Sequence, residues 1–232
     1  MTTTVYDLIN KTVASDTRWS AQLTLSDGNN YIVYVDDSDF EKIADRESAV
    51  LVLAGLGTLI AQWKEWWYNS LDENCCPPVE DASGNTAVSL MIIDKSSGQI
   101  IFDAGQKKAM FCKFTSNMLS VFAGSGDIHA ASCWHNNRCA KTAITSASNL
   151  DFFTSPIVRF VDFASGQTNL TSMCYNYKEI MDAMLRGGFV MDMSKSPAAN
   201  DEGVPLNQTQ VHNEIVSLIA SGKVVASAPV QD

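Results

Sequence analysis

Residues 49–54 read AVLVLA, an unbroken apolar run that leads directly into Gly55-Leu56-Gly57. A run of this length without polar alternation is typical of a strand that is buried on both faces. The apolar positions that recur at helical spacing beyond the turn are Leu56, Ile60, Trp63 and Trp67. This part of the chain therefore predicts a buried strand, a glycine turn and an amphipathic helix.

The same order, an apolar strand that ends in glycines and opens a helix, recurs further along the chain. Residues 118–123 read MLSVFA and precede Gly124-Ser125-Gly126, and residues 127–150 predict one long helix. Other patterns predict hairpins over 3–15, 21–35 and 88–104, a strand over 153–164, helices over 177–185 and 213–221, and a loop over 191–208.

This alternation of strand groups and helix groups favours an α+β domain with helices packed on antiparallel sheets. A doubly wound parallel sheet fits the order less well. No repeat and no convincing linker divides the 232 residues, so a single domain over 1–232 is expected. The polar stretch 69–86 predicts an exposed excursion, and the part after about residue 164 predicts a helical extension.

Composition narrows the class of function. The chain has 26 acidic and 16 basic residues, a formal net charge of −10, and no block of Lys or Arg, which argues against nucleic-acid binding. The longest apolar run is too short to cross a bilayer, and the start MTTTVYDLIN lacks the basic and apolar regions of a signal peptide. We expect a cytoplasmic protein without membrane contact, with association with a virion as the alternative.

Metal and cofactor motifs are also missing from the sequence. The six cysteines do not have zinc-knuckle spacing, and neither H-x-E nor H-E-x-x-H occurs. The cysteines are expected to be buried or half-buried reduced thiols. We therefore predict no metal and no cofactor.

Four short features could carry chemistry, although each also has an ordinary structural reading as a strand edge or a turn. If Met1 is removed, Thr2 carries a hydroxyl nucleophile and an α-amine with a pKa of about 7.7–8.0, which can take the hydroxyl proton without a histidine. Asp16 follows a predicted strand and precedes Arg18 by two positions. Backbone N–H groups at the two glycine turns, around Gly55 and Ser125, could hold an oxyanion.

Together, the order of these features resembles proteasome β subunits and the bacterial peptidase HslV, which are N-terminal-nucleophile (Ntn) hydrolases. The resemblance covers roughly residues 2–163 and lies in pattern and order, without a long identical run. It implies the Ntn-hydrolase fold, a four-layer αββα sandwich in which two antiparallel sheets lie between helix layers. The residues that match the family's catalytic positions are Thr2, Asp16, Lys42, Gly55, Ser125 and Asp151.

The resemblance also implies a role for each of these residues. Thr2 would be the nucleophile, Asp16 its supporting carboxylate, and Lys42 the cation that lowers the pKa of the amine. Gly55 would supply the oxyanion N–H, and Ser125 with Asp151 would complete the network. The implied activity is that of a threonine peptidase, which hydrolyses peptides or unfolded proteins inside a homo-oligomeric ring, with an unfoldase or a virion protein as candidate partner.

Two alternatives stay open. A catalytically silent relative would keep the fold as a structural or assembly protein, for example in a phage particle. It is favoured by Ser155-Pro156, where the family has Gly-Gly, because proline removes a backbone donor. A retained Met1 would also favour it, because an acylated amine cannot act as a base. The second alternative is an amidase of the same class that acts on a small molecule and needs no ring.

Overall fold

The structure is a computed structural model that describes residues 2–228. Strands extend over β1 (Thr4–Asp7), β2 (Thr12–Asp16), β3 (Trp19–Thr24), β4 (Asn30–Val35), β5 (Ile43–Asp45), β6 (Ala49–Leu56), β7 (Val88–Asp94), β8 (Ile100–Ala104), β9 (Lys108–Phe111), β10 (Met118–Ala123), β11 (Val158–Asp162), β12 (Phe189–Asp192), β13 (Val204–Pro205) and β14 (Ser227–Ala228). The α-helices are α1 (Gly57–Asn69), α2 (Asp127–Asn137), α3 (Ala140–Ala147), α4 (Lys178–Gly187) and α5 (His212–Ala220). Short 3₁₀ turns occur at Glu73–Cys75, Met193–Lys195 and Leu206–Gln208.

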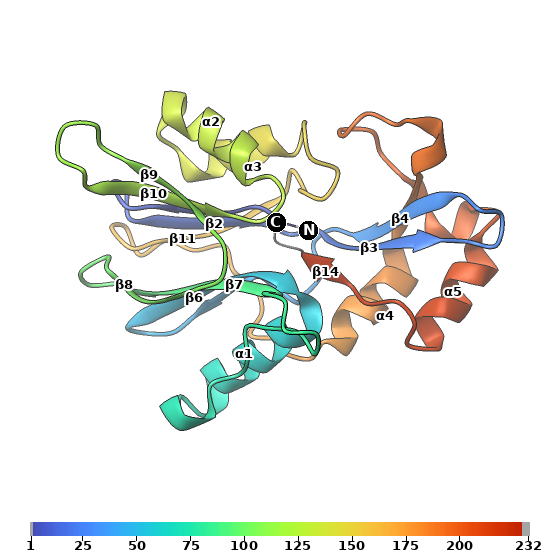
Figure 1. Ribbon diagram of the computed structural model, residues 1–232, viewed down its shortest axis with the longest axis horizontal. Helices are drawn as coiled ribbons and strands as arrows, with labels where there is room; N and C mark the ends of the chain where they lie inside the picture. Colours follow the sequence, from blue (N-terminus) through green and yellow to red (C-terminus); the bar gives the residue numbers. More distant parts are fainter. Residues whose placement is uncertain (1, 229–232) are drawn as a thin grey trace.

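The predicted αββα sandwich of two antiparallel sheets is wrong. The described residues form an α+β protein with three small antiparallel sheets, of five, four and four strands, and five helices. The first sheet has the order β11-β2-β1-β10-β9, the second contains β5 to β8, and the third has the order β13-β12-β4-β3. Within residues 2–228, the second and third sheets are hydrogen-bonded to each other through β14, which is two residues long and lies between β3 and β6 (Figure 1). Strands β3 and β6 do not pair with each other, so the hydrogen-bonded connection between these two sheets depends on the two residues of β14.

The helices cover different sheets. Helices α2 and α3 pack on the five-stranded sheet, where Trp134 and Ile144 meet Val5 and Phe122 in one buried cluster. The opposite face of this sheet, which includes Tyr6, packs against β5, β6 and β7 in a second cluster. The largest cluster joins α1, α4 and α5 to strands β3, β4, β6 and β7. Figure 1 shows α4 and α5 beside β3 and β4, at the other end of the molecule from β8 and β9.

The local predictions had mixed outcomes. The strand, turn and helix expected around residue 55 are confirmed as β6 and α1, and the first hairpin is confirmed as β1 paired with β2. The single helix predicted over 127–150 is wrong, because Arg138 takes a left-handed conformation with φ 51° and separates α2 from α3. The loop predicted over 191–208 contains strand β13 and two 3₁₀ turns.

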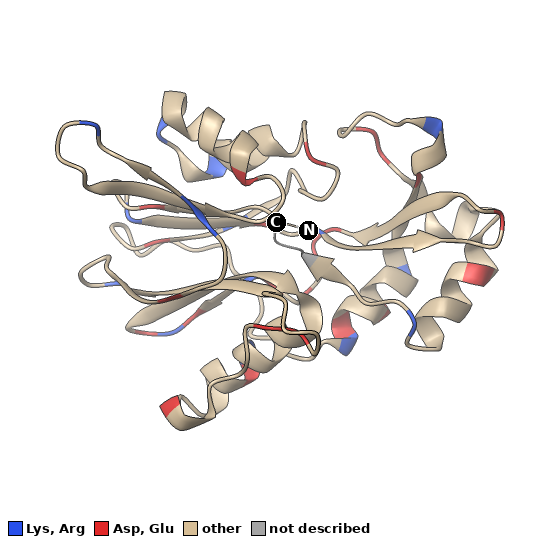
Figure 2. Cartoon of the chain, in the orientation of Figure 1, with Lys and Arg blue, Asp and Glu red and all other residues tan. Residues whose placement is uncertain are grey.

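Charge and cysteine placement add two observations. Figure 2 shows the Lys and Arg residues as short separate segments over many elements, interspersed with Asp and Glu. The six cysteines are unpaired, as predicted, but Cys75 and Cys76 are exposed and only the other four are half-buried. Within the described residues, no helix is long and apolar enough to cross a membrane.

The packing of α3 on the five-stranded sheet can be tested by truncating a buried side chain. Ile144 on α3 is fully buried, whereas Ile128 on neighbouring α2 is 55% exposed. We expect Ile144→Ala to lower the free energy of unfolding by about 2–5 kcal/mol, because it leaves a cavity. The matched Ile128→Ala should change it by less than about 0.5 kcal/mol. Urea unfolding followed by circular dichroism measures both, and equal effects would contradict this packing.

Candidate functional site

The buried carboxylate of Asp16, at the end of β2, lies at the centre of the candidate site. Its Oδ1 accepts hydrogen bonds from the hydroxyl of Thr2 and, at 2.7 Å, from the backbone N–H of Thr3. Its Oδ2 accepts from the backbone N–H of Arg18 at 2.8 Å and of Ser155 at 3.1 Å. The carboxylate therefore connects the start of β1, the turn after β2 and the segment before β11.

Lys42 supplies the matching positive charge. Its Nζ lies 3.1 Å from both carboxylate oxygens of Asp16 and donates to the carbonyl oxygen of Arg18 at 2.6 Å. Both side chains of the ion pair are completely buried. Burial lowers the pKa of the Lys42 ammonium below its ordinary value, and the charge of Asp16 opposes this shift. Lys42 is thus a buried member of the site.

The backbone around Lys42 is held by three different elements. The indole N–H of Trp19 donates to the carbonyl oxygen of Phe40 at 2.8 Å, and Nζ of Lys64 on α1 donates to that of Glu41 at 2.8 Å. The N–H of Leu53 on β6 donates to the carbonyl oxygen of Lys42 itself at 2.9 Å. Buried carbonyl groups without partners are costly, so these bonds fix the position from which Lys42 reaches Asp16.

A second group of side chains lies on the other side of Thr2. The hydroxyl of Ser125 donates to Asp151 Oδ2 at 2.5 Å and lies 3.5 Å from the carbonyl oxygen of Thr2. The hydroxyl of Thr154 donates to the same Asp151 oxygen at 2.6 Å and lies 2.6 Å from the hydroxyl of Thr3. The predicted residues Thr2, Ser125 and Asp151 are therefore brought together.

The glycines on either side of Ser125 allow this approach. Gly124 has a φ of +96°, and a Cβ there would lie 2.0 Å from the carbonyl oxygen of Thr2. A Cβ on Gly126 would lie 2.1 Å from the hydroxyl oxygen of Thr3. Real side chains never come this close, so the Gly124-Ser125-Gly126 motif is needed for the N-terminal threonines to pack against the end of β10.

Gly55 lies near the end of β6, and its position follows from strand alternation. The N–H of Leu53 points to the side of β6 on which Lys42 lies, and the N–H of Gly57 points to the same side, where it donates to the carbonyl oxygen of Ala226 at 3.1 Å. Alternate residues of a strand direct their N–H groups to the same side, so the N–H of Gly55 lies between these two. Its φ of +131° and a Cβ position 2.1 Å from the carbonyl oxygen of Ala87 explain why glycine is required.

The departure at Ser155-Pro156 does not remove a donor from Asp16. Ser155 is fully buried and its N–H makes the contact to Asp16, whereas Pro156, which has no N–H, is exposed. The hydroxyl oxygen of Ser155 also accepts from the N–H of Ile157 at 3.1 Å. The backbone donor to Asp16 therefore comes from Ser155, and the missing N–H of Pro156 does not affect it.

Sequence reasoning did not identify Arg18, Thr154 and Lys64 as parts of this region. Arg18 forms a bidentate pair with Asp36 at 2.8 and 2.9 Å and places its guanidinium 3.9 Å from the centre of the Tyr34 ring. The spacing Asp16-x-Arg18 was a usable signal for Arg18. The spacing Asp151-x-x-Thr154 was likewise a usable signal for Thr154. Lys64 had none, because a lysine on a helix is normally a surface residue.

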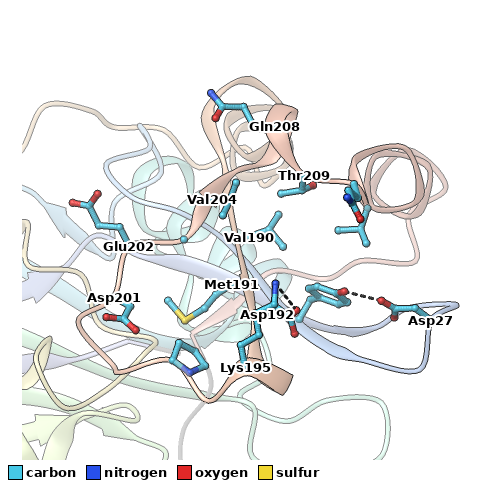
Figure 3. A pocket seen from close by; sticks show the side chains of 15 residues that line it. Asp27, Val190, Met191, Asp192, Lys195, Asp201, Glu202, Val204, Gln208 and Thr209 are labelled. Atoms are coloured by element: carbon cyan, nitrogen blue, oxygen red, sulfur yellow. Dashed lines mark hydrogen bonds and ion pairs between the residues drawn. The ribbon is translucent and has the colours of Figure 1, made fainter.

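Pockets near and far from this network differ in their lining. A pocket of about 400 Å³ reaches the network at Arg18 and Thr154. A larger one, of about 610 Å³, is lined by residues such as Tyr31, Asp192 and Lys195 and by none of the predicted site residues (Figure 3). Among residues 2–228 no group of three or more His, Cys, Asp or Glu side chains could hold a metal ion.

The role of Asp16 can be tested through stability. In Asp16→Asn, one amide N–H₂ would face the buried ammonium of Lys42 and the acceptor charge would be lost. We expect the free energy of unfolding to fall by about 3–5 kcal/mol, the usual effect of breaking a buried ion pair. Asp103→Asn, which removes an ion pair with Lys107 at a half-exposed carboxylate, should cost at most about 1 kcal/mol. Chemical denaturation compares the two, and equal losses would contradict a central role for Asp16.

The buried Lys64 predicts a pH dependence of stability. Desolvation lowers its pKa from 10.5 to about 8, so between these pH values the unfolded chain binds more protons at this residue than the folded chain. The stability of the wild-type protein relative to Lys64→Met should therefore rise by about 3 kcal/mol as the pH increases through this window. Lys178→Met, at an exposed lysine, controls for the loss of one charge. The free energy of unfolding of both proteins is measured at about pH 8 and at about pH 10.5. A difference between wild type and Lys64→Met that does not change with pH would contradict the lowered pKa of Lys64.

No protein-family model matches the chain, and no curated protein sequence matches it. An assignment of function therefore depends on the geometry of the site itself.

Proposed function

We propose that this chain is a threonine-type hydrolase that cleaves peptide bonds, with the Thr2 hydroxyl as its nucleophile. The observation that carries the proposal is the convergence of the Thr2 hydroxyl and the Lys42 ammonium on the buried carboxylate of Asp16. Six residues named from the sequence come from separate parts of the chain. Five of them are linked by hydrogen bonds, and the sixth, Gly55, lies on the adjoining strand.

A purely structural role explains this arrangement less well. Removing two charges from water has a large cost, and apolar residues of similar size usually stabilise a fold at least as well as a buried ion pair. Clusters of buried charges beside a nucleophilic side chain are accordingly enriched at functional sites. Here the buried pair lies beside a hydroxyl that is one peptide bond from Met1.

The proposal requires the removal of Met1, which lies outside the described residues. Hydrolysis of the bond between Met1 and Thr2 would turn the Thr2 amide nitrogen into an α-amine. The positive charge on Lys42, near Asp16, would lower the pKa of this amine and favour its neutral form. A neutral amine next to its own hydroxyl can act as the general base.

The reaction then follows in two steps. The hydroxyl oxygen of Thr2 attacks the substrate carbonyl carbon while its proton moves to the α-amine, and the N–H of Gly55 stabilises the negative oxygen that forms. The amine returns the proton to the leaving nitrogen, the peptide bond breaks, and an ester to Thr2 remains. Water, deprotonated by the same amine, hydrolyses this ester and restores the hydroxyl.

One observation favours the catalytically silent alternative: the Thr2 side chain is fully buried in this structure. A silent protein could keep the network for packing alone. The homo-oligomeric ring, the small-molecule amidase and the identity of any partner remain predictions. Exposed apolar side chains on and near β8 and β9, such as Ile101, Phe111 and Phe114, would suit a subunit contact.

Substitution of the nucleophile tests the proposal. We expect intact-protein mass spectrometry to show that Met1 is absent, and the purified protein to hydrolyse fluorogenic peptides. Thr2→Ala should lower the rate by at least about 10³-fold, because it removes the hydroxyl that forms the ester. Thr2→Ser should retain measurable activity, because it keeps the hydroxyl and the amine.

The exposed Thr24→Ala, on β3, serves as the matched control and should hydrolyse at the wild-type rate. A retained Met1, or a Thr2→Ala protein as active as wild type, would exclude the threonine nucleophile. Gel filtration of the same sample distinguishes a ring from a monomeric amidase.

A further inference from the structure

The segment 224–228 lies in an unusual position between two sheets. Its last two residues form β14, in which Ser227 pairs with Ser20 of β3 on one side and with Leu56 of β6 on the other. Both pairings are antiparallel, and Figure 1 shows β14 between the β3–β4 and β6–β7 regions. Without this segment, the edges of β3 and β6 would face one another across a gap one strand wide.

The segment fits this gap closely. Val224 and Ala226 are buried and Val225 between them is exposed, which is the alternation of a strand. The carbonyl oxygen of Ala226 accepts from Gly57 N–H at 3.1 Å, and its N–H donates to the hydroxyl of Tyr177 at 2.8 Å. A Cβ on Gly57 would lie 2.7 Å from the carbonyl oxygen of Ala226, so only glycine permits this approach.

The same segment covers the predicted oxyanion donor. Ala228 is the partner of Gly55 in the antiparallel pairing with β6. The N–H of Gly55 lies on the side of β6 that carries Lys42 and Ala226, as the bonds of Leu53 and Gly57 on either side of it indicate. The chain's own backbone therefore runs along the strand edge to which an acyl group held by Gly55 would have to bind.

We propose that segment 224–228 is an internal inhibitor, which fills the gap between β3 and β6 where the extended peptide substrate of the proposed hydrolase would bind. An incoming peptide would add as a strand and replace the backbone pairing of β14, as in other cases of strand addition. This inference rests on the proposed function, since it names the regulation of the site at which that reaction would take place.

The geometry also defines the class of peptide. Ala226 is fully buried, and the space around Gly57 is bounded by the rings of Tyr177 and Trp19. An occupant therefore needs a small side chain at the position of Ala226. A bulky residue there would overfill the buried space that Ala226 occupies in the largest core cluster.

Binding can be tested without catalysis. The probe is a fluorescein-labelled peptide with the sequence of residues 222–232, GKVVASAPVQD, and the readout is fluorescence anisotropy. In Ala226→Arg the long charged side chain cannot stay buried and should expel the segment. We expect this variant to bind the probe at least about tenfold more tightly than the wild type, because its site is open in more molecules. Val225→Arg, at the exposed neighbouring position, should bind the probe as weakly as the wild type does. A probe peptide that carries Ala226→Trp should bind neither the wild type nor the Ala226→Arg protein.

A second variant locks segment 224–228 in its place, so the test does not depend on whether Ala226→Arg folds correctly. Ser20→Cys with Ser227→Cys places thiols at a cross-strand pair, where a disulfide can form. Oxidation should abolish probe binding and lower peptide hydrolysis by at least about tenfold, and a reductant should restore both. Wild-type protein treated in parallel controls for its six natural cysteines.

These outcomes separate the two proposals. If Ala226→Arg binds the probe but no variant hydrolyses peptides, the peptide site stands and the hydrolase fails. If hydrolysis depends on Thr2 while oxidation of the double variant changes nothing, the hydrolase stands and the inhibitory segment is overturned. Equal probe binding by Ala226→Arg and the wild type, together with an inert oxidised variant, overturns the peptide site.

Discussion

The charge of Asp16 is the constraint on which the site and much of the fold depend. A carboxylate that is removed from water must be matched by donors and by a positive charge. Here the Thr2 hydroxyl, three backbone N–H groups and the Lys42 ammonium meet this need. These donors come from segments far apart in the sequence, so satisfying one side chain fixes the relative positions of β1, β2, the residues before β5 and the turn before β11. The arrangement that positions the candidate nucleophile is thus the one that the buried charge already requires.

A steric constraint complements this electrostatic one. The N-terminal threonines can approach Asp151 and Ser125 only because Gly124 and Gly126 have no side chains. Hydroxyl groups of Ser125 and Thr154 then satisfy the second carboxylate, Asp151, without a cation. The two carboxylates consequently have different environments, one paired with a buried ammonium and the other with hydroxyl groups. Thr2, which lies between the two carboxylates, therefore experiences a different electrostatic effect from each of them.

Local patterns in the sequence predicted the elements that are defined by neighbouring residues. The apolar run before Gly55 and the Gly124-Ser125-Gly126 turn each gave a strand followed by a helix, because burial and backbone freedom are local properties. The sheet arrangement was not predicted, because it depends on β12, β13 and β14, which are two to four residues long and lack any periodic signal. The burial of Lys42 and Lys64 was not predicted either, because a lysine is normally exposed to solvent and its burial depends on tertiary contacts. The order of the sequence patterns nevertheless named five residues that hydrogen bonds bring together, namely Thr2, Asp16, Lys42, Ser125 and Asp151.

The failure of the two-sheet prediction and the closure of the candidate site have the same physical origin. Strands β3 and β6 are separated by the width of one strand, and β14, which pairs with both of them, occupies that space with only two residues. A strand this short contributes few backbone hydrogen bonds, so exchanging it for another extended chain has a low cost compared with opening a full-length strand. The exchange would take place opposite Gly55, next to the ion pair of Asp16 and Lys42. The point at which the sheets are least continuous is therefore the point at which a peptide could reach the proposed chemistry.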